Sequence, residues 1–411
     1  MKVPSDAMIP IADAQRRVWD ACTRLGTEVV DHAQAVGRVL ASDVVAAENV
    51  PPFDNSAVDG YAVRAADVSS VPVELTVIDT VAAGAASART VQAGEAIRIM
   101  TGAPIPGGVD AVVMVEDSER LENNRVRLTK AAEVGAAIRE AGSDVRSGEV
   151  VFRVGTVLNA AAIGVLASIN ARSVEVWRPA RVALLSTGDA LVTDGSPLAA
   201  GQIRESNLTM LDELIRRTGC ELINLGVVRD DEAELERVLR DASERCDAIV
   251  TSGGVSMGDF DVVKAVLSRI ADMQWMQLAI KPAKPFAFGQ LRTADGRTVP
   301  IFGLPGNPVS SMISYELMAR PALKAMMGHE HTERTRITAI TEAPMKRKRD
   351  GKVHYMRVFA AFGSDGRLRV RESGPQGSHQ LAATAMANGV AVVPDGDGLP
   401  AGAEVEVFLL D

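Results

Sequence analysis

The sequence has few cysteines, no long hydrophobic run and none of the common hydrolase signatures, and each absence excludes a class of protein. Its three cysteines, Cys22, Cys220 and Cys246, lie far apart without a C-x-x-C pair, which disfavours a disulfide framework or a thiolate zinc site. We interpret all three as buried, inert thiols. No apolar run reaches the ~18 residues of a membrane span, and charged side chains interrupt the N-terminal segment where a signal peptide needs an apolar core. We therefore expect a cytoplasmic protein without membrane contact.

Several recognition and catalytic patterns are also missing. The chain contains no G-x-x-x-x-G-K-[ST], G-x-S-x-G or H-E-x-x-H segment, and its five histidines show no ligand spacing. The net charge of -9 argues against nonspecific nucleic-acid binding by the whole surface. The basic run at residues 346–349 is the exception. We interpret it as part of a solvated hairpin strand, with a nucleic-acid or targeting patch as the alternative.

What the chain does have is enough length for several domains, since 411 residues exceed one ordinary domain. Apolar residues at three- and four-residue spacing predict an amphipathic helix over residues 11–25. Short β-rich runs over residues 71–128 predict a small β module inserted into a helical domain. The last segment is rich in strands and turns and predicts a small β-barrel or sandwich. We expect a multidomain α/β plus β protein with these domains: helical, 1–48 and 142–178; inserted β module, 49–141; α/β, 179–326; C-terminal β, 327–411.

Strands and helices alternate regularly through residues 181–323, which predicts a parallel sheet covered by helices on both faces. Ligands bind such sheets in the crevice at the carboxyl ends of the strands. Polar or glycine-rich segments follow the predicted strands there, and Asn307-Pro308 has the form of a helix start that favours an anion. The residues that we expect to bind substrate at this edge are Ser186, Thr187, Gly188, Gly253, Gly254, Ser256, Pro305, Gly306, Asn307 and Pro308.

Three carboxylates would share the same edge, namely Asp189, Asp230 and Asp261. Acids beside anion-binding loops repel each other and a phosphate unless a hard cation lies between them, so we interpret them as Mg²⁺ ligands. The alternative is that Asp189 or Asp261 caps a following helix. Lys281 and Lys284, in a proline-stiffened segment, would neutralise an oxyanion; the alternative is two solvated lysines on an edge strand.

An irregular acidic stretch, "PPFDNSAVDGYAVRAAD" at residues 51–67, lies where the helical domain meets the β module. It holds Asp54, Asn55, Asp59 and Asp67 around an aromatic residue and Gly60. Polar loops at domain junctions are good positions for site residues.

Nine segments in order resemble those of the MoeA family of molybdopterin molybdenumtransferases, which is related to the C-terminal domain of gephyrin. They span essentially the whole chain: "FDNSAVDGYAV", "IMTGAPIPGGVDAVVMVED", "AGSDVRSGE", "STGD", "GQIRESN", "TSGGVSMGDFD", "KPAKPFAFG", "GLPGNPVSS" and "GPQGSHQLAATAMANG". The resemblance implies four domains and an elongated homodimer whose site lies between the α/β domain of one subunit and the N-terminal parts of the other.

The activity that the resemblance implies is a transferase of molybdenum cofactor biosynthesis, which takes adenylylated molybdopterin and molybdate, with Mg²⁺, to molybdenum cofactor and AMP. Candidate partners are a molybdopterin adenylyltransferase and downstream cofactor-handling proteins. Carried onto this sequence, the catalytic positions contributed across the dimer are Asp59, Thr101 and Asp144. Ser378 matches a C-terminal site position.

Three positions depart from the family pattern. Ala190 follows the "STGD" acid where family members usually carry Glu, Ala283 replaces the glycine of "KPGKP", and Gln277 stands where a lysine is often found. Asp230 or Glu205 could supply the missing carboxylate. Two alternative functions therefore stay open, a pterin adenylyltransferase and a paralogue that binds molybdopterin without inserting metal.

Overall fold

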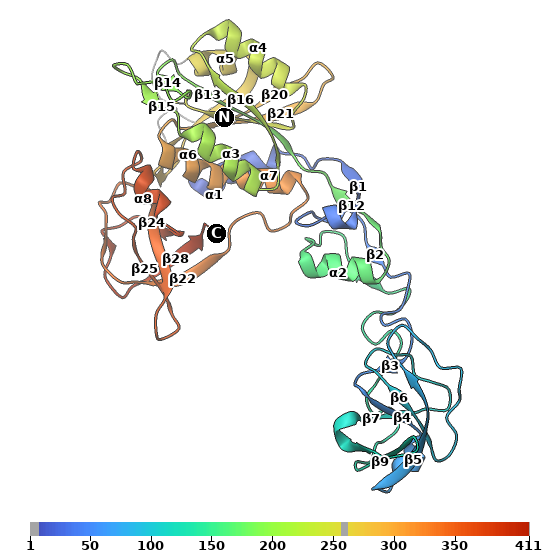
Figure 1. Ribbon diagram of the computed structural model, residues 1–411. Coiled ribbons are helices and arrows are strands. Elements are labelled where there is room, and N and C mark those ends of the chain that lie inside the picture. Colours follow the sequence, from blue (N-terminus) through green and yellow to red (C-terminus); the bar gives the residue numbers. More distant parts are fainter. Residues whose placement is uncertain (1–7, 256–261, 411) are drawn as a thin grey trace. The chain divides into compact units, whose positions relative to one another are not determined.

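The computed structural model describes residues 8–255 and 262–410. The chain divides into two compact units, Met1–Glu28 with Trp177–Asp411, and Val29–Val176 (Figure 1). Over the described ranges, no helix combines the length and the hydropathy that crossing a bilayer requires.

The larger unit contains an α/β domain built on a six-stranded sheet. Its strands follow the spatial order β16 (Glu221–Val228), β13 (Arg181–Thr187), β17 (Ala248–Ser252), β21 (Thr298–Leu304), β20 (Pro285–Arg292) and β18 (Ala271–Gln277). The first four pair in parallel, whereas β20 pairs antiparallel with both β21 and β18. The expected parallel sheet is therefore mixed. Short connections join β18 to β20 and β20 to β21, and a short connection can only join antiparallel neighbours. A pair of two-residue strands, β14 (Leu191–Val192) and β15 (Ile203–Arg204), follows β13.

Helices cover both faces of this sheet, as expected (Figure 1). Successive residues of β13 point to opposite faces, so Leu184 packs in one core and Leu185 in the other. The second core contains α4 (Glu232–Ser243) and α5 (Val262–Ile270). The first contains α1 (Ile11–Asp20), α3 (Asn207–Arg217), α6 (Pro308–Ser314) and α7 (Arg320–Met326), the last two joined by a π-helical turn at Tyr315–Ala319.

The position of α1 departs from the expectation that residues 1–48 belong to the N-terminal helical domain. Ala14 and Val18 of α1 are fully buried in the first core of the α/β domain, and the whole segment to Glu28 groups with the larger unit. The amphipathic pattern predicted the helix and its buried face. It carried no information about which domain would cover that face.

The C-terminal domain is a closed barrel. Its strands follow the order β24 (Val353–Phe362), β25 (Leu368–Glu372), β22 (Arg336–Thr341), β28 (Glu404–Leu409) and β26 (Gly389–Val393), and β26 pairs back onto β24. The short β23 (Met345–Lys346) and β27 (Gly398–Leu399) pair beside it, and α8 (Leu381–Ala385) precedes β26. One strand of the α/β domain, β19 (Ile280–Lys281), pairs in parallel with β24. The barrel is thereby hydrogen-bonded to the segment that carries Lys281.

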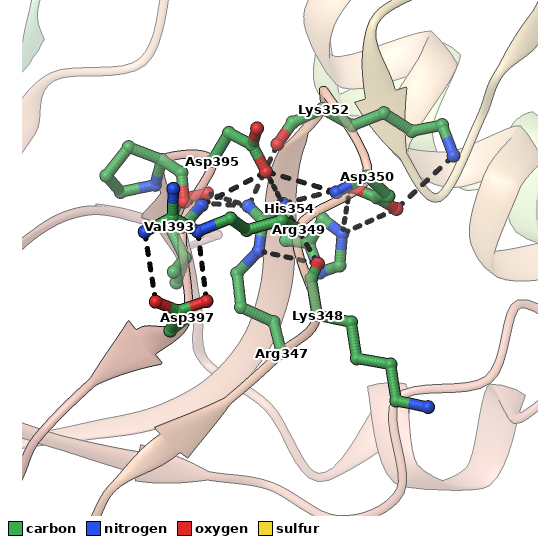
Figure 2. A network of polar contacts seen from close by, with 11 residues as sticks. Arg347, Lys348, Arg349, Asp350, Lys352, His354, Val393, Asp395 and Asp397 are labelled. Atoms are coloured by element: carbon green, nitrogen blue, oxygen red, sulfur yellow. Dashed lines mark hydrogen bonds and ion pairs between the residues drawn. The ribbon is translucent and has the colours of Figure 1, made fainter.

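Lys346, Lys348 and Arg349 of the basic run are exposed, as we expected of a solvated strand, but Arg347 is not. Figure 2 shows Arg347 at the centre of a polar network, and its side chain is fully buried. Its guanidinium donates to the Asp350 carboxylate at 2.9 Å and to the carbonyls of Lys352 and Pro394 at 2.8 and 2.7 Å. His354 Nε2 lies 3.2 Å from both oxygens of Asp350. A buried guanidinium is tolerated here because carboxylates and carbonyls satisfy it.

The smaller unit is centred on a second six-stranded sheet. Its order is β7 (Ala111–Met114), β4 (Gly60–Val63), β6 (Glu95–Ile99), β5 (Val73–Val81), β9 (Arg125–Leu128) and β8 (Ser118–Arg120). This sheet lies within the expected β module. The flanking segments carry α2 (Ala160–Ser168) and three strand pairs: β1 (Thr27–Asp31) with β12 (Ser173–Trp177), β2 (Val44–Val45) with β11 (Val150–Phe152), and β3 (Asn55–Ser56) with β10 (Ile138–Arg139).

Candidate functional site

The carboxyl ends of the parallel strands meet at one edge of the α/β sheet, as the sequence predicted. Ser186 of β13 is in register with Val227 of β16 and Ser252 of β17, and Ser252 is in register with Leu304 of β21. Ser186 is almost fully buried and its hydroxyl donates to the Ser252 carbonyl at 3.4 Å. It therefore joins two strands below the edge, and the segments after it form the exposed rim.

Two of the three predicted metal ligands lie side by side on that rim. The Asp189 amide donates to Asp230 Oδ2 at 3.2 Å, and the Asp230 amide donates to Asp189 Oδ1 at 3.3 Å. This reciprocal pair ties the loop after β13 to the loop after β16 and places two exposed carboxylates together. Asp189 caps no helix, since β14 follows it. The cap of α4 is Asp231, which accepts from the Glu234 amide at 2.7 Å. Asp261 and Ser256 lie outside the described residues.

The glycines after β17 are required by local geometry. Gly253 and Gly254 have φ values of 92° and 72°, which favour glycine because side chains clash there. A Cβ on Gly254 would lie 2.2 Å from the Cβ of Val263 in α5. The Gly253 amide donates to the Leu304 carbonyl at 3.0 Å, so this turn is fixed to the end of β21.

Asn207, at the start of α3, holds these loops together. Its Nδ2 donates to Ser252 Oγ at 2.9 Å and to the Gly306 carbonyl at 2.7 Å. The side chain is buried, and its Oδ1 has no partner among the described residues. Our sequence reasoning placed Asn207 at the end of "GQIRESN" and at the start of a predicted helix, but did not single it out as a site residue. The available signal was an asparagine at a helix start directly after a polar loop.

Both predicted lysines line a cavity of about 610 Å³ beside the rim. Lys281 and Lys284 share it with Pro305, Asn307 and Ser378. Asn307 Nδ2 donates to Ser378 Oγ at 3.2 Å, so the barrel contributes Ser378 directly to the α/β domain's edge. α6 begins at Pro308, as expected for a helix start. Within the described ranges neither lysine forms an ion pair, which leaves both ammonium groups available to an anion.

The loop that carries Ser378 is supported by Arg357, which our sequence reasoning missed. Arg357 is almost fully buried, and its guanidinium donates to the carbonyls of Pro375, Gln376 and Gly377 at 3.0 to 3.1 Å. Burial lowers the pKa of Arg357. An arginine within the otherwise apolar strand "VHYMRVFA" was the available signal, because buried charges need a specific partner.

The smaller unit brings together two of the predicted catalytic residues. Asp59 Oδ1 accepts hydrogen bonds from the amide and the hydroxyl of Thr101, both at 2.7 Å. These two bonds, with a further contribution from the charge of Arg98, hold the pKa of Asp59 below its usual range. The next residue is Gly60, where a Cβ would lie 2.0 Å from the Val113 carbonyl oxygen, so the close approach of β4 to β7 beside Asp59 requires glycine. The result is an exposed, ionised carboxylate on a fixed frame.

Asp144 lies in the same unit on an exposed turn. Its amide donates to the Val50 carbonyl at 3.0 Å. Asp54, three residues beyond Pro51, accepts from the Ala141 amide at 2.7 Å. The acidic loop and the turn that carries Asp144 are thus connected through their backbones, although the structure gives no contact between Asp144 and the Asp59–Thr101 pair.

A magnesium ion fits the rim of the α/β domain. Mg²⁺ is commonly bound by one or two carboxylates, with waters and substrate phosphates completing its octahedron. Asp189 and Asp230 supply two exposed carboxylates of the right type. In the described part of the chain no group of three or more metal-binding side chains occurs, so a substrate would have to complete the coordination.

Comparison with known proteins matches this architecture domain by domain. The "MoeA N-terminal region (domain I and II)" matches residues 9–170, the "Probable molybdopterin binding domain" residues 183–325, and the "MoeA C-terminal region (domain IV)" residues 338–410. A molybdopterin molybdenumtransferase of Haemophilus influenzae is 37% identical over 88% of both chains. Molybdopterin molybdenumtransferase 2 of Mycobacterium tuberculosis is 35% identical over 98% of this chain and 99% of its own.

A solved structure extends the likeness to the fold. The crystal structure of the molybdopterin biosynthesis moeA protein from Pyrococcus horikoshii OT3 is 30% identical and covers 98% of this chain and 100% of its own, with a TM-score of 0.81. Identity, coverage and fold agree, and the chain belongs to the MoeA family of molybdopterin molybdenumtransferases.

Proposed function

We propose that this chain is a transferase of molybdenum cofactor biosynthesis that inserts molybdenum from molybdate into adenylylated molybdopterin, with Mg²⁺-dependent release of AMP. The observation that carries the proposal is the cavity in which Lys281, Lys284, Asn307 and Ser378 converge. The Asp189–Asp230 pair lies on the same edge of the sheet, in the loops after β13 and β16. Such a site suits a ligand with several negative charges together with a hard cation.

The lysines would bind the oxyanion. Molybdate is a tetrahedral dianion, and two unit charges 4 Å apart attract by about 1 kcal/mol in water and about 4 kcal/mol near a protein surface. One lysine at the surface is therefore a weak anchor, and two on one stiff segment act together. Ser378 and Asn307 add directional hydrogen bonds, because hydroxyl and amide groups can donate to the remaining oxygens.

The acids of the α/β domain would hold Mg²⁺. When bound, the ion supplies neutralisation and polarisation of a phosphate oxygen. Asp189 and Asp230 are fixed by reciprocal backbone hydrogen bonds, so their geometry is set before substrate arrives. Glu205 does not replace the carboxylate missing at Ala190, because both of its oxygens accept from the Leu208 amide at 2.9 Å. Asp230 is the neighbour that can do so.

The Asp59–Thr101 pair has the properties of a cation or water positioning group. Both hydrogen bonds from Thr101 enter Oδ1, which leaves Oδ2 for a ligand. A carboxylate whose pKa is lowered is ionised at neutral pH and is a weak proton acceptor. We infer that Asp59 orients a cation or a water and takes no proton in the reaction.

The proposal includes a homodimer in which the N-terminal unit of one subunit completes the site of the other. Support comes from the smaller unit's surface, where branched aliphatic side chains are exposed by 37 to 68%: Val29, Val36, Val45, Val150, Val154 and Val157. Exposed apolar surface of this kind is available for association with another protein. Sedimentation velocity of the purified chain tests this, and a monomer at micromolar concentration would contradict it.

Two other functions are disfavoured. A pterin adenylyltransferase would use the α/β domain alone, whereas the relatives named transferases match this chain over nearly its full length. A non-catalytic paralogue is favoured by Ala190 only. The matched regions before and after the α/β domain, residues 9–170 and 338–410, are those of MoeA proteins.

The deciding experiment is AMP release by the purified chain from adenylylated molybdopterin, with Mg²⁺ and micromolar molybdate. Asp59→Asn should lower the rate by about 100-fold or more while the fold stays intact. Thr101→Val removes the hydroxyl and keeps the amide donor, so the loss should be about 10-fold. Asp43→Asn is the matched control in the same unit, because among the described residues Asp43 accepts only from the Val154 amide and contacts Arg153.

Three results would refute the assignment. If the chain consumes ATP with free molybdopterin, the adenylyltransferase is correct. Binding of the substrate without either reaction would establish the non-catalytic paralogue. Unchanged turnover in Asp59→Asn would remove the role given to that residue.

A further inference from the structure

A second cavity lies on the smaller unit, and its lining includes none of the residues to which the proposed function gives a role. Its volume is about 780 Å³, and it opens over the face of the sheet formed by β4, β5, β6 and β8. Three arginines line it, Arg98, Arg120 and Arg125, whereas Asp79 is its single carboxylate. The lining therefore carries an excess of positive charge.

Arg98 is the best-positioned of the three. It lies directly across from Tyr61 in the β4–β6 ladder, and its guanidinium carbon is 4.9 Å from the centroid of the Tyr61 ring. Its Nη1 is buried and has no acceptor among the described residues. Stacking fixes the plane of the guanidinium, while an unsatisfied donor of this kind is unfavourable. The Arg98 guanidinium is therefore fixed in its plane by the Tyr61 ring, and one of its donors has no hydrogen-bond acceptor among the described residues.

The other charges of the cavity do not supply that acceptor. Arg120 forms no ion pair within the described residues. Arg125 shares Glu74 with Arg127, at 2.6 and 2.8 Å. The oxygens of Asp79 are occupied by the Thr80 amide at 2.8 Å and the Ser87 hydroxyl at 2.6 Å.

The cavity adjoins the Asp59–Thr101 pair. Met100, which precedes Thr101, lines it, and so does Val115, whose amide donates to the Asp59 carbonyl at 2.9 Å. A ligand in the cavity would therefore lie next to the pair to which the proposed function gives a role.

We propose that this cavity is a subsite for the phosphoryl group of an organic phosphate. A guanidinium can donate two parallel hydrogen bonds to phosphate oxygens, and Arg98 and Arg120, which both line the cavity and form no ion pair among the described residues, suit that chemistry. The volume exceeds what a single inorganic ion fills, and it leaves room for the organic part. In identifying the phosphate with that of adenylylated molybdopterin, the inference rests on the proposed function; the subsite itself does not.

The test is amide hydrogen exchange of the full-length chain, read by mass spectrometry, with inorganic pyrophosphate and AMP as separate probes at matched ionic strength. Binding in the cavity should slow exchange in residues 60–63 and 95–99, which form β4 and β6. Arg98→Gln should weaken the effect by about 10-fold or more, and Arg98→Lys should restore only part of it, because lysine lacks the planar fork. Arg153→Gln is the control, since Arg153 is 77% exposed and lies outside the cavity.

Arg120→Gln provides a second variant at an exposed position, in case Arg98→Gln unfolds the unit; it should weaken the effect as well. Protection by AMP exceeding that by pyrophosphate supports an organic phosphate. Protection by pyrophosphate alone, absence of protection in both segments, or an unchanged response in Arg98→Gln and Arg120→Gln would overturn the proposal. AMP release is measured separately, so a failure of catalysis with retained protection would count against the proposed function only.

Discussion

Replacing Gly254 by alanine should destabilise the α/β domain more than the same change at any open glycine. At φ 72° an L-residue costs about 1 to 2 kcal/mol. The new Cβ would also lie 2.2 Å from the Cβ and Cγ2 of Val263, and Val263 is buried. Overpacking of this kind costs about 1 to 3 kcal/mol. The free energy of unfolding should therefore fall by about 2 to 5 kcal/mol.

Gly226 provides the matched control. Its φ is 74°, and a Cβ there would meet no atom within 4 Å. Gly226→Ala thus carries the backbone cost without the collision, about 1 to 2 kcal/mol. Both substitutions reduce the entropy of the unfolded chain equally, so that contribution cancels in the difference.

Urea unfolding followed by tryptophan fluorescence measures both variants well. Trp19, Trp177 and Trp275 are the only tryptophans in the sequence, and all belong to the unit that holds both glycines. Gly254→Ala should be less stable than Gly226→Ala by about 1 to 3 kcal/mol. Equal stabilities would refute the close packing of the loop after β17 against α5. The loop after β17 also forms part of the rim of the candidate site. Gly254→Ala should therefore impair AMP release as well.

Three further predictions concern charge and reactivity. Asp247 is buried, which raises its pKa, but hydrogen bonds from Arg178 at 2.6 and 2.7 Å and from the Arg181 amide outweigh this and hold the pKa below 3.8. The contribution of Asp247 to the free energy of unfolding is complete above the unfolded pKa of about 3.9 and is lost as the pH falls through the folded pKa. Urea titrations should show that Asp247→Asn lowers the stability by about 3 kcal/mol at pH 7 and weakens the loss of stability at acid pH. If the variant lost stability at acid pH as the parent does, the Asp247–Arg178 ion pair would not have the stabilising role given to it. Cys220 and Cys246 are buried, whereas Cys22 is only partly buried, so our interpretation of three buried thiols is wrong for Cys22. Desolvation raises the pKa of each thiol to about 12; iodoacetamide at pH 8 should label Cys220 and Cys246 only after unfolding, and labelling of either in the native chain would contradict their burial. Ala190→Glu adds a carboxylate at an exposed position beside the Asp189–Asp230 pair, and it should lower the Mg²⁺ concentration for half-maximal AMP release; no change would mean that Asp230 already suffices.

The alternation of strands and helices made the α/β domain predictable, because periodicity reports which faces are buried. The edge residues Asp189 and Asp230 followed from it, since parallel strands end together. The Asp59–Thr101 pair was different. Forty-two residues separate the two, so local sequence could not pair them: Asp59 stood out in the acidic loop, whereas Thr101 came from the family resemblance alone.

The misses share one cause. The burial of Arg347 and the position of α1 both depend on which partner the fold supplies, and the sequence pattern does not encode the partner. A charged residue is normally exposed, and only the convergence of the Asp350 carboxylate and backbone carbonyls reverses this for Arg347. Likewise, the antiparallel edge of the sheet reflects connection lengths more than strand composition.

The pairing of β19 with β24 bears on how such proteins can be recombined. Lys281 sits in a two-residue strand whose hydrogen-bonding partner, His354, belongs to the barrel. A truncation before residue 338 would expose that strand's edge and remove Ser378 from Asn307. A chimera that exchanges barrels between relatives should therefore carry residues 279–285 along with the barrel, because the boundary of the exchangeable module does not coincide with the boundary of the fold.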